Sequence, residues 1–160
     1  HPEKVVASGG ISWRKGQELY GNIYDHMASE FEFANGVRYM SHCRQYPAGC
    51  FRQVSDMVVG SKGKSTGTDL ATEQGINPYV QEHTDLLNSI RGTGPYQNQG
   101  MAIAESTMTC IMARESAYCG EQVTWDRIMA SQLDLQPKAF DYKLKMADGE
   151  VPEPGKYKLI

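Results

Sequence analysis

Residues 27–41 read MASEFEFANGVRYMS, with apolar and polar side chains alternating on both sides of Asn35-Gly36. Alternation with a period of two is typical of a strand that buries one face. Asn-Gly is the preferred pair for a two-residue type I′ turn between antiparallel strands. The stretch therefore predicts a β-hairpin with strands over 27–33 and 37–41.

A two-residue turn at Asn35-Gly36 also predicts the register of this hairpin. It places Phe31 opposite Met40 and His26 opposite Gln45. Arg44 then lies on the face opposite to His26, so at most one of the two faces a ligand cleft, unless the strand twists or bulges after Cys43. The face that carries His26 has three interpretations: a solvated outer face, a wall of a ligand cleft or a polar subunit interface. Its polar and aromatic members are His26, Glu30, Glu32, Tyr39 and Gln45.

Outside the hairpin the sequence changes from strand to helix patterns. Short strands are predicted over 5–7 and 53–59, and the glycine-rich residues 61–77 are expected to form an exposed loop. Apolar residues then recur at three and four positions, which predicts helices over 78–91 and 101–119 and a short helix after Thr124. The order predicts one α+β domain over residues 1–160: an open, mainly antiparallel sheet with helices packed on one face.

The composition is that of an ordinary globular domain. The 160 residues carry 16 basic and 19 acidic side chains, a net charge of −3, which argues against a nucleic-acid-binding protein. No apolar run is long enough to span a membrane. Because residue 1 is His and no signal peptide is visible, we expect a mature product, a trimmed chain or the ordered part of a longer protein.

The motifs of several self-contained enzymes are absent from this sequence. There is no G-x-G-x-x-G turn of a nucleotide-binding fold and no G-x-S-x-G elbow of a serine hydrolase. Gly63-Lys64-Ser65 follows a predicted strand, but Val58 stands where a P-loop requires glycine. These enzyme classes are therefore not predicted.

The cysteines are expected to be free thiols, mostly buried, because their number is far below that of a disulfide-rich scaffold. A local Cys43–Cys50 bridge and a zinc site at His42, Cys43 and Cys50 are weaker interpretations. One hypothesis for the function of the chain is a small thiol enzyme that uses Cys43 or His26. The full set is Cys43, Cys50, Cys110 and Cys119.

Several strings, in order along nearly the whole chain, resemble the C-terminal domain of the bacterial glucose–fructose oxidoreductase and inositol dehydrogenase family (Gfo/Idh/MocA). Each string alone is weakly specific, and their order and spacing carry the resemblance. They are NIYDH at 22–26, EFEFANGVR at 30–38, CRQ at 43–45, PYVQEH at 78–83, NSIR at 88–91, AEST at 104–107, VTWD at 123–126 and PGKYKLI at 154–160.

The resemblance implies a two-domain enzyme in which an N-terminal Rossmann domain holds NAD or NADP. The second domain lines the substrate cleft and builds the oligomer interface, and the reaction is hydride transfer on a sugar, sugar acid or cyclitol. The family's glycine-rich turn, its Glu-Lys-Pro motif and its Asp-x-x-x-His pair are missing here. We therefore expect most of a C-terminal domain, with the upstream Rossmann domain as its partner in the same polypeptide, and no cofactor bound by this chain alone.

The candidate substrate-binding residues follow from the same strings. His26 is the best candidate, because an imidazole beside a sugar hydroxyl accepts its hydrogen bond and exchanges its proton. Tyr24 is expected to stack on a sugar ring, and Arg44 and Gln45 to contact polar substrate groups. His83, on the apolar stripe of a predicted helix, is either a packed core residue or a second substrate contact. No catalytic, cofactor-binding or metal-binding residue is assigned.

The sequence thus favours the substrate-binding and assembly domain of an NAD(P)-dependent oxidoreductase. The alternative is a stand-alone carbohydrate-binding or protein-interaction module of the same fold. A homo-oligomer is expected through the open sheet, and neither a nucleic-acid nor a membrane partner. The compartment is left open between the cytoplasm and the periplasm.

Overall fold

The computed structural model describes residues 1–67, 76–145 and 149–160. The chain divides into two compact units. The first unit consists of His1–Ala48 together with Met101–Ile160, and the second of Gly49–Gly100. The prediction of a single domain over residues 1–160 stays a prediction.

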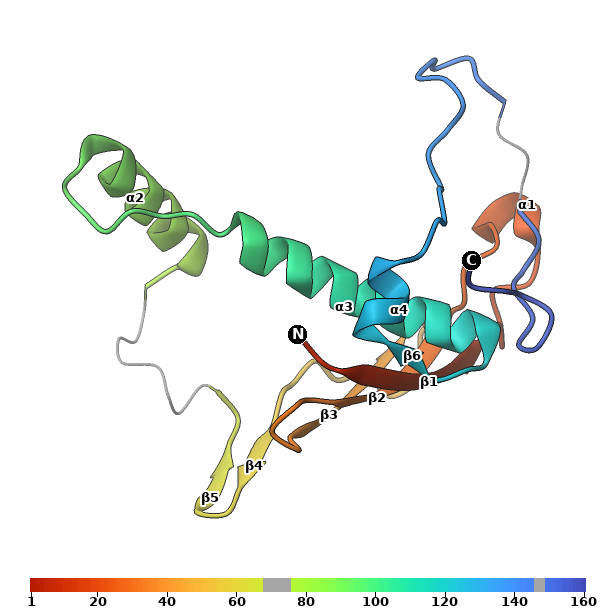
Figure 1. The fold of residues 1–160 in the computed structure, drawn as a ribbon, viewed down its shortest axis with the longest axis horizontal. Helices are drawn as coiled ribbons and strands as arrows, with labels where there is room; N and C mark the ends of the chain where they lie inside the picture. Colours follow the sequence, from red (N-terminus) through yellow and green to blue (C-terminus); the bar gives the residue numbers. More distant parts are fainter. Residues whose placement is uncertain (68–75, 146–148) are drawn as a thin grey trace. The chain divides into compact units, whose positions relative to one another are not determined.

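The first unit is built on a four-stranded antiparallel sheet (Figure 1). Its strands are β1 (Lys4–Gly10), β2 (His26–Glu32), β3 (Arg38–Arg44) and β6 (Val123–Thr124), in the order β3-β2-β1-β6. Helices complete the unit, so the predicted α+β class is confirmed at this level. The specific likeness to a dehydrogenase C-terminal domain stays a prediction.

The β2–β3 hairpin forms as predicted, but its turn and register differ from the prediction. Gly36 has a φ of 78°, whereas Asn35 does not have the positive φ that a type I′ turn requires. The Gly36 N–H donates to the Phe33 carbonyl, and the Phe33 N–H donates to Val37, which closes a three-residue loop over 34–36. The register is therefore shifted by one residue, and His26 pairs with Arg44 instead of Gln45.

This shift exchanges the side chains between the two faces of β3. Phe31 pairs with Tyr39 instead of Met40, and their rings stack at 5.6 Å between centroids. Tyr39 and Gln45 therefore leave the face that carries His26, while Met40 and Arg44 join it. The predictions that Gln45 shares the face of His26 and that Arg44 lies on the opposite face both depended on a two-residue turn.

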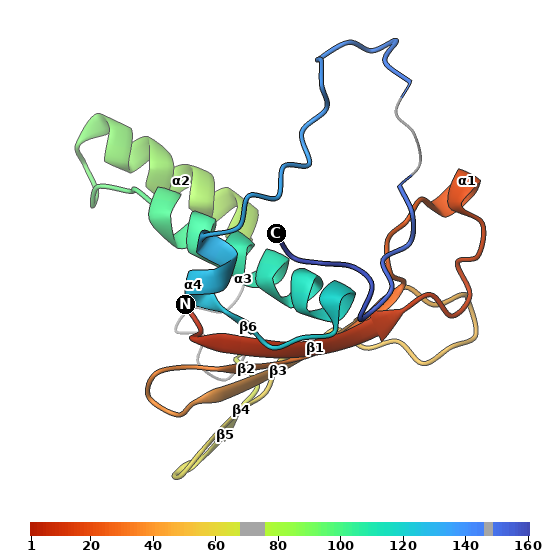
Figure 2. The same ribbon diagram turned by 45° about the vertical axis from the view of Figure 1, so that its right-hand side comes forward.

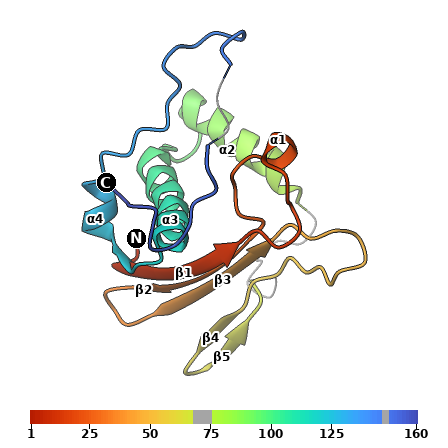
Figure 3. The ribbon, with the colours of Figure 1, turned by 90° about the vertical axis from the view of Figure 1, so that its right-hand side faces the viewer.

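Helix α3 (Gly100–Cys119) covers one face of the sheet, and this contact forms the core. Figure 3 shows α3 lying above β1, β2 and β3. The sheet contributes Val5, which is 1% exposed, and Phe31, and the helix contributes Met112, which is fully buried. The same cluster is completed by Ala7, Tyr24, Ala113, Ala117, Tyr118, Cys119, Val123 and Ile128.

The opposite face of the sheet remains exposed. Val6 on β1 is 55% exposed and Met40 on β3 is 69% exposed. Three ion pairs also lie on this face: Lys4 with Glu32 at 3.1 Å, and Arg38 with Glu30 and with Glu32. We call Val6, Glu30, Glu32, Arg38 and Met40 the open-face patch.

Ser116 of α3 compensates for the short length of β6. Because β6 pairs only with Lys4 and Val5, the backbone of Ala7 has no strand beside it on that edge. The buried Ser116 hydroxyl accepts the Ala7 N–H at 3.0 Å and donates to the carbonyl of Glu121 at 2.7 Å. A buried N–H that would otherwise lack a partner is thereby satisfied.

The C-terminal segment returns to α3 (Figure 2). The Tyr157 hydroxyl donates to Glu115 at 2.6 Å, and Glu115, only 1% exposed, also pairs with Arg114 at 2.7 Å. Burial and the adjacent Glu115 carboxylate raise the pKa of Tyr157. The Gly155 N–H donates to the Cys119 carbonyl, which fixes the segment at the end of the helix.

The first unit also contains two short helices. Helix α4 (Trp125–Met129) begins after Thr124, whose hydroxyl accepts the Arg127 N–H at 3.2 Å, as an N-cap residue does. Helix α1 (Gln17–Tyr20) is a short helix in the connection between β1 and β2, for which no helix was predicted.

The second unit contains a two-stranded hairpin of β4 (Val58–Gly60) and β5 (Gly63–Ser65), and helix α2 (Pro78–Arg91). The predicted strand over 53–59 is wrong for residues 53–57, where Val54 is fully exposed. The predicted loop over 61–77 contains β5, and its residues 68–75 lie outside the described part. The bounds of α2 are confirmed, with Asn77 as N-cap and Gly92 as a left-handed C-cap.

The four thiols are free, but only Cys119 is buried, so the expectation of mostly buried cysteines is wrong. Among the helices of the described ranges, none has the length and apolar character needed to cross a membrane.

Candidate functional site

The candidate site is organised by the buried carboxylate of Asp25, directly before β2. Asp25 is 2% exposed. Its Oδ2 accepts the backbone N–H groups of Ser12, Trp13 and Arg14 at 2.9, 2.9 and 3.0 Å. Its Oδ1 lies 2.8 Å from Nδ1 of His26. One side chain thus holds both the loop after β1 and the imidazole at the start of β2.

Asp25 is held in its ionised form. Burial alone would raise the pKa of this carboxyl, but the hydrogen bonds from His26, Arg14, Trp13 and Ser12 outweigh burial and lower the pKa well below its usual range. A carboxylate can only accept hydrogen bonds. Asp25 is therefore a permanent acceptor for the His26 ring.

The tautomer of His26 follows from this contact. Since Asp25 only accepts, Nδ1 of His26 carries the proton and Nε2 is left as an acceptor in the neutral ring. The His26 side chain is 37% exposed. A Cβ placed on Gly10 would lie at an ordinary contact distance, 3.7 Å, from Cε1 of His26, so the ring lies beside the end of β1. Such an imidazole binds a hydroxyl donor and can take up its proton.

Arg44 lies beside His26, which corrects the prediction that they face opposite sides. The two residues are paired across β2 and β3, so their side chains leave the sheet on the same face. Both contact Tyr46. The Arg44 guanidinium lies 5.1 Å from the Tyr46 ring centroid, and the His26 ring meets Tyr46 edge-on at 6.3 Å.

Gln45 belongs to the other side of this strand end, where it meets the loop after β1. The Gln45 carbonyl accepts the indole N–H of Trp13, and its Oε1 lies 3.4 Å from Nη2 of Arg14. The Arg14 guanidinium lies 5.4 Å from the ring of Trp13 and 5.6 Å from that of Tyr20. A cation is thus placed beside two aromatic rings, which meet edge-on at 5.8 Å.

Tyr24 does not have the exposure that stacking on a sugar requires. It is 9% exposed, its hydroxyl donates to the Pro152 carbonyl at 2.7 Å, and its ring packs edge-on against Tyr118 at 4.8 Å. The structure therefore places Tyr24 in the core of the first unit.

His83 lies on α2 in the second unit. Its side chain is 72% exposed, so the interpretation of His83 as a packed core residue is wrong. Its Nδ1 donates to the Tyr79 carbonyl one turn earlier, at 2.7 Å. The predicted apolar stripe is likewise exposed, since α2 has no buried residue.

Sequence reasoning missed four residues of this site: Asp25, Trp13, Arg14 and Tyr46. Asp25 stands beside His26 in the quoted string NIYDH, and an acidic residue adjacent to a candidate histidine was a usable signal. Trp13 and Arg14 carried no comparable signal, because their contacts with Gln45 join positions more than 30 residues apart.

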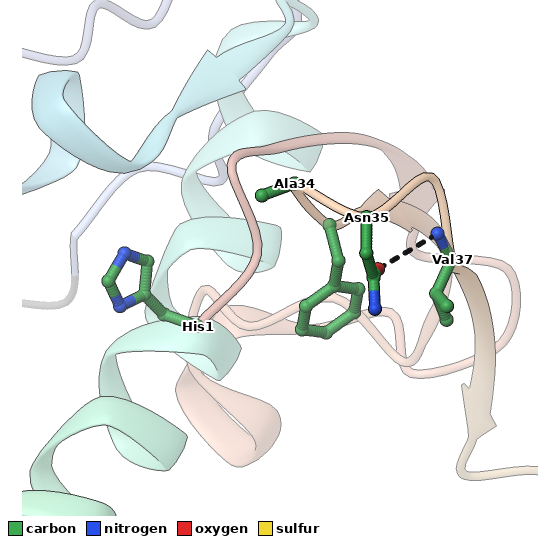
Figure 4. A pocket seen from close by; sticks show the side chains of 5 residues that line it. His1, Ala34, Asn35 and Val37 are labelled. Atoms are coloured by element: carbon green, nitrogen blue, oxygen red, sulfur yellow. Dashed lines mark hydrogen bonds between the residues drawn. The ribbon is translucent and has the colours of Figure 1, made fainter.

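A separate shallow hollow lies at the turn of the β2–β3 hairpin, the opposite end from His26 and Arg44. His1, Phe33, Ala34, Asn35 and Val37 line it, and Asn35 accepts the Val37 N–H at 3.1 Å (Figure 4). It contributes nothing to the Asp25–His26 site. Within the described residues no group of histidine, cysteine and acidic side chains is arranged to hold a metal ion.

Comparison of the chain with protein-family models, curated proteins and solved structures gave no match. The site is therefore interpreted from its own geometry and from the sequence strings.

Proposed function

We propose that this chain is the C-terminal substrate-binding and assembly domain of an NAD(P)-dependent oxidoreductase that acts on a sugar, a sugar acid or a cyclitol. Its partner is an upstream Rossmann domain of the same polypeptide, which binds NAD or NADP. No residue of this chain is assigned to the cofactor. The observation that carries the proposal is the 2.8 Å contact between Asp25 and Nδ1 of His26.

This contact suits His26 to bind a substrate hydroxyl. A nicotinamide bound by the upstream domain would supply the hydride acceptor for alcohol oxidation, and the hydroxyl proton would leave to a base of the protein. Nε2 of His26 accepts the hydrogen bond of that hydroxyl, and Asp25 stabilises the ring when it gains the proton. Arg44, on the same face, binds further substrate oxygens.

The open-face patch supports the assembly part of the proposal. Val6 on β1 and Met40 on the edge strand β3 expose apolar surface, and Arg38 lies beside Glu30 and Glu32. A patch with both apolar surface and both signs of charge is self-complementary across a two-fold axis. A second copy of the chain is therefore the proposed cover.

The test is steady-state kinetics on the complete natural gene product. NAD⁺ and NADP⁺ are each supplied with sugars, sugar acids and cyclitols, and reduction of the cofactor is followed. We expect turnover with a member of these classes, and His26→Asn lowers kcat/KM by about 100-fold, a typical loss for a group that transfers a proton. His42→Asn, an exposed histidine on the same face of β3, is the matched control and leaves kcat/KM unchanged.

Other outcomes decide against the proposal. Sugar binding without reduction of either cofactor supports the stand-alone carbohydrate-binding module instead. Equal kcat/KM values for the His26→Asn and His42→Asn variants remove His26 from the substrate site.

A further inference from the structure

Arg14 differs from the other arginines of the first unit whose ion pairs the structure shows. Arg38 pairs with Glu30 and Glu32, Arg114 with Glu115 at 2.7 Å, and Arg127 with Glu121 at 2.7 Å. Within the part of the chain that the structure describes, Arg14 has no carboxylate partner for its guanidinium.

The charge of Arg14 is also poorly hydrogen-bonded. Its Nε is buried and has no hydrogen-bond partner among the described residues, and its Nη2 reaches Gln45 only at the long distance of 3.4 Å. The ring centroids of Trp13 and Tyr20 lie 5.4 and 5.6 Å from the guanidinium carbon. A partly desolvated cation without a counter-ion is unfavourable, so it is a candidate for compensation by a ligand.

Asp25, whose carboxylate accepts the backbone N–H of Arg14, does not provide that compensation. Its Oδ2 accepts the backbone N–H of Arg14 together with those of Ser12 and Trp13, and its Oδ1 is occupied by His26. The same contacts fix the backbone of Arg14, while the two rings hold its side chain. The guanidinium is therefore positioned before any ligand arrives.

We propose that Arg14 binds a carboxylate of the ligand, and that the substrate is a sugar acid rather than a neutral sugar or cyclitol. This inference rests on the proposed function and narrows its substrate class. A planar guanidinium matches a carboxylate through two parallel hydrogen bonds, and a monoanion balances its single charge. A neutral polyol supplies no charge to Arg14.

The test compares D-gluconate with D-glucitol, which carry the same six-carbon polyol chain with and without a carboxylate. Binding to the full chain is measured by NMR titration, with the Nε–H signal of Arg14 as a local probe. We expect gluconate to bind at least about tenfold more tightly than glucitol, a preference that decreases as the salt concentration rises. Gluconate should shift the Arg14 signal and glucitol should not.

The variants locate this preference on Arg14. Arg14→Gln should bring the affinities for gluconate and glucitol together, chiefly by weakening the binding of gluconate. Arg127→Gln is the matched control, because it removes one positive charge from a paired arginine of the same unit and should keep the preference. A folded state of each variant is checked by its amide spectrum.

Four results overturn the inference. Equal affinities of the unmodified chain for gluconate and glucitol do so before any variant is made. An unchanged preference in Arg14→Gln places the anion contact elsewhere. Binding of glucitol alone, or binding of glucitol more tightly than gluconate, excludes a carboxylate subsite but leaves the proposed function standing. Binding of neither compound overturns the sugar-binding proposal as well.

Discussion

At the scale of single residues, Asp25 connects the loop after β1 to the imidazole of His26. Three backbone N–H groups and one ring nitrogen converge on a side chain that is 2% exposed. The loop and the histidine therefore depend on the same negative charge. A change at Asp25 is expected to alter stability and ligand binding together.

The lowered pKa of Asp25 predicts a specific acid dependence of stability. As the pH falls, the unfolded chain takes up the proton first, near its ordinary pKa of about 3.9. The stabilisation by Asp25 is therefore complete above that value and is lost as the pH falls toward the folded-state pKa. Asp25→Asn should lower the free energy of unfolding by about 2–4 kcal/mol near neutral pH and remove this dependence.

Urea unfolding at a series of pH values measures this effect. Asp126→Asn, at an exposed aspartate in the first turn of α4, is the control and should keep the acid dependence. An Asp25→Asn protein with the same acid dependence as the unmodified chain would contradict the role of this carboxylate.

Gly9 is required by a close approach between β1 and β2. A Cβ at this position would lie 2.4 Å from the backbone carbonyl oxygen of His26 and 3.0 Å from the Tyr24 ring. Because a backbone oxygen in a paired strand cannot move aside, Gly9→Ala should lower the free energy of unfolding by about 1–3 kcal/mol. Gly10→Ala meets its nearest atom at 3.7 Å and should change it by less than about 0.5 kcal/mol. Equal thermal unfolding of the two variants would refute this account of Gly9.

At the scale of elements, the β2–β3 hairpin shows how much a local pattern can predict. The alternation in residues 27–41 correctly predicts two strands and the turn between them. It does not predict the register, because Asn35-Gly36 fits both a two-residue turn and a three-residue loop with glycine in the left-handed position. The choice of loop decides whether Arg44 or Gln45 lies beside His26, and so decides the composition of the site.

The register can be measured directly. The Gln45 N–H donates to the Asp25 carbonyl, so Ala28 and His42 form a pair without mutual hydrogen bonds, in which the α-carbons approach closely. We expect a strong NMR contact between the α-hydrogens of Ala28 and His42. A strong contact between the α-hydrogens of Ser29 and His42 instead would restore the two-residue turn and separate Arg44 from His26.

Other elements illustrate what local patterns leave out. The bounds of α2 are predictable because Asn77, Pro78 and Gly92 act locally at its ends. The apolar residues within 53–59 are strand-like, but only Val58–Gly60 finds a partner in Gly63–Ser65. A strand requires a neighbour for its backbone, and no short window of sequence contains that neighbour.

At the scale of the whole molecule, the first unit has one face covered by α3 and one uncovered. Val6 and Met40 lie on the uncovered face. The sequence predicted a face that needs a cover, since an antiparallel sheet with helices on one side leaves the other side open. Which residues lie on that face could be assigned only from the observed register, which moved Met40 onto it.

The proposed assembly predicts that a charge in the open-face patch separates the subunits. Val6→Glu should convert an oligomer into a monomer with unchanged secondary structure, because it buries an unpaired carboxylate in the interface. Val54→Glu, at a fully exposed valine of the second unit, is the control. Size-exclusion chromatography with light scattering measures both, and an unmodified chain that is monomeric at high concentration would contradict the assembly role.

Native mass spectrometry of the complete natural gene product tests the central claim most directly, because one spectrum reports polypeptide length, subunit number and any retained dinucleotide. The proposed function predicts a polypeptide longer than these 160 residues that forms an oligomer and carries NAD or NADP. A gene product that ends near this length and retains no dinucleotide would contradict it.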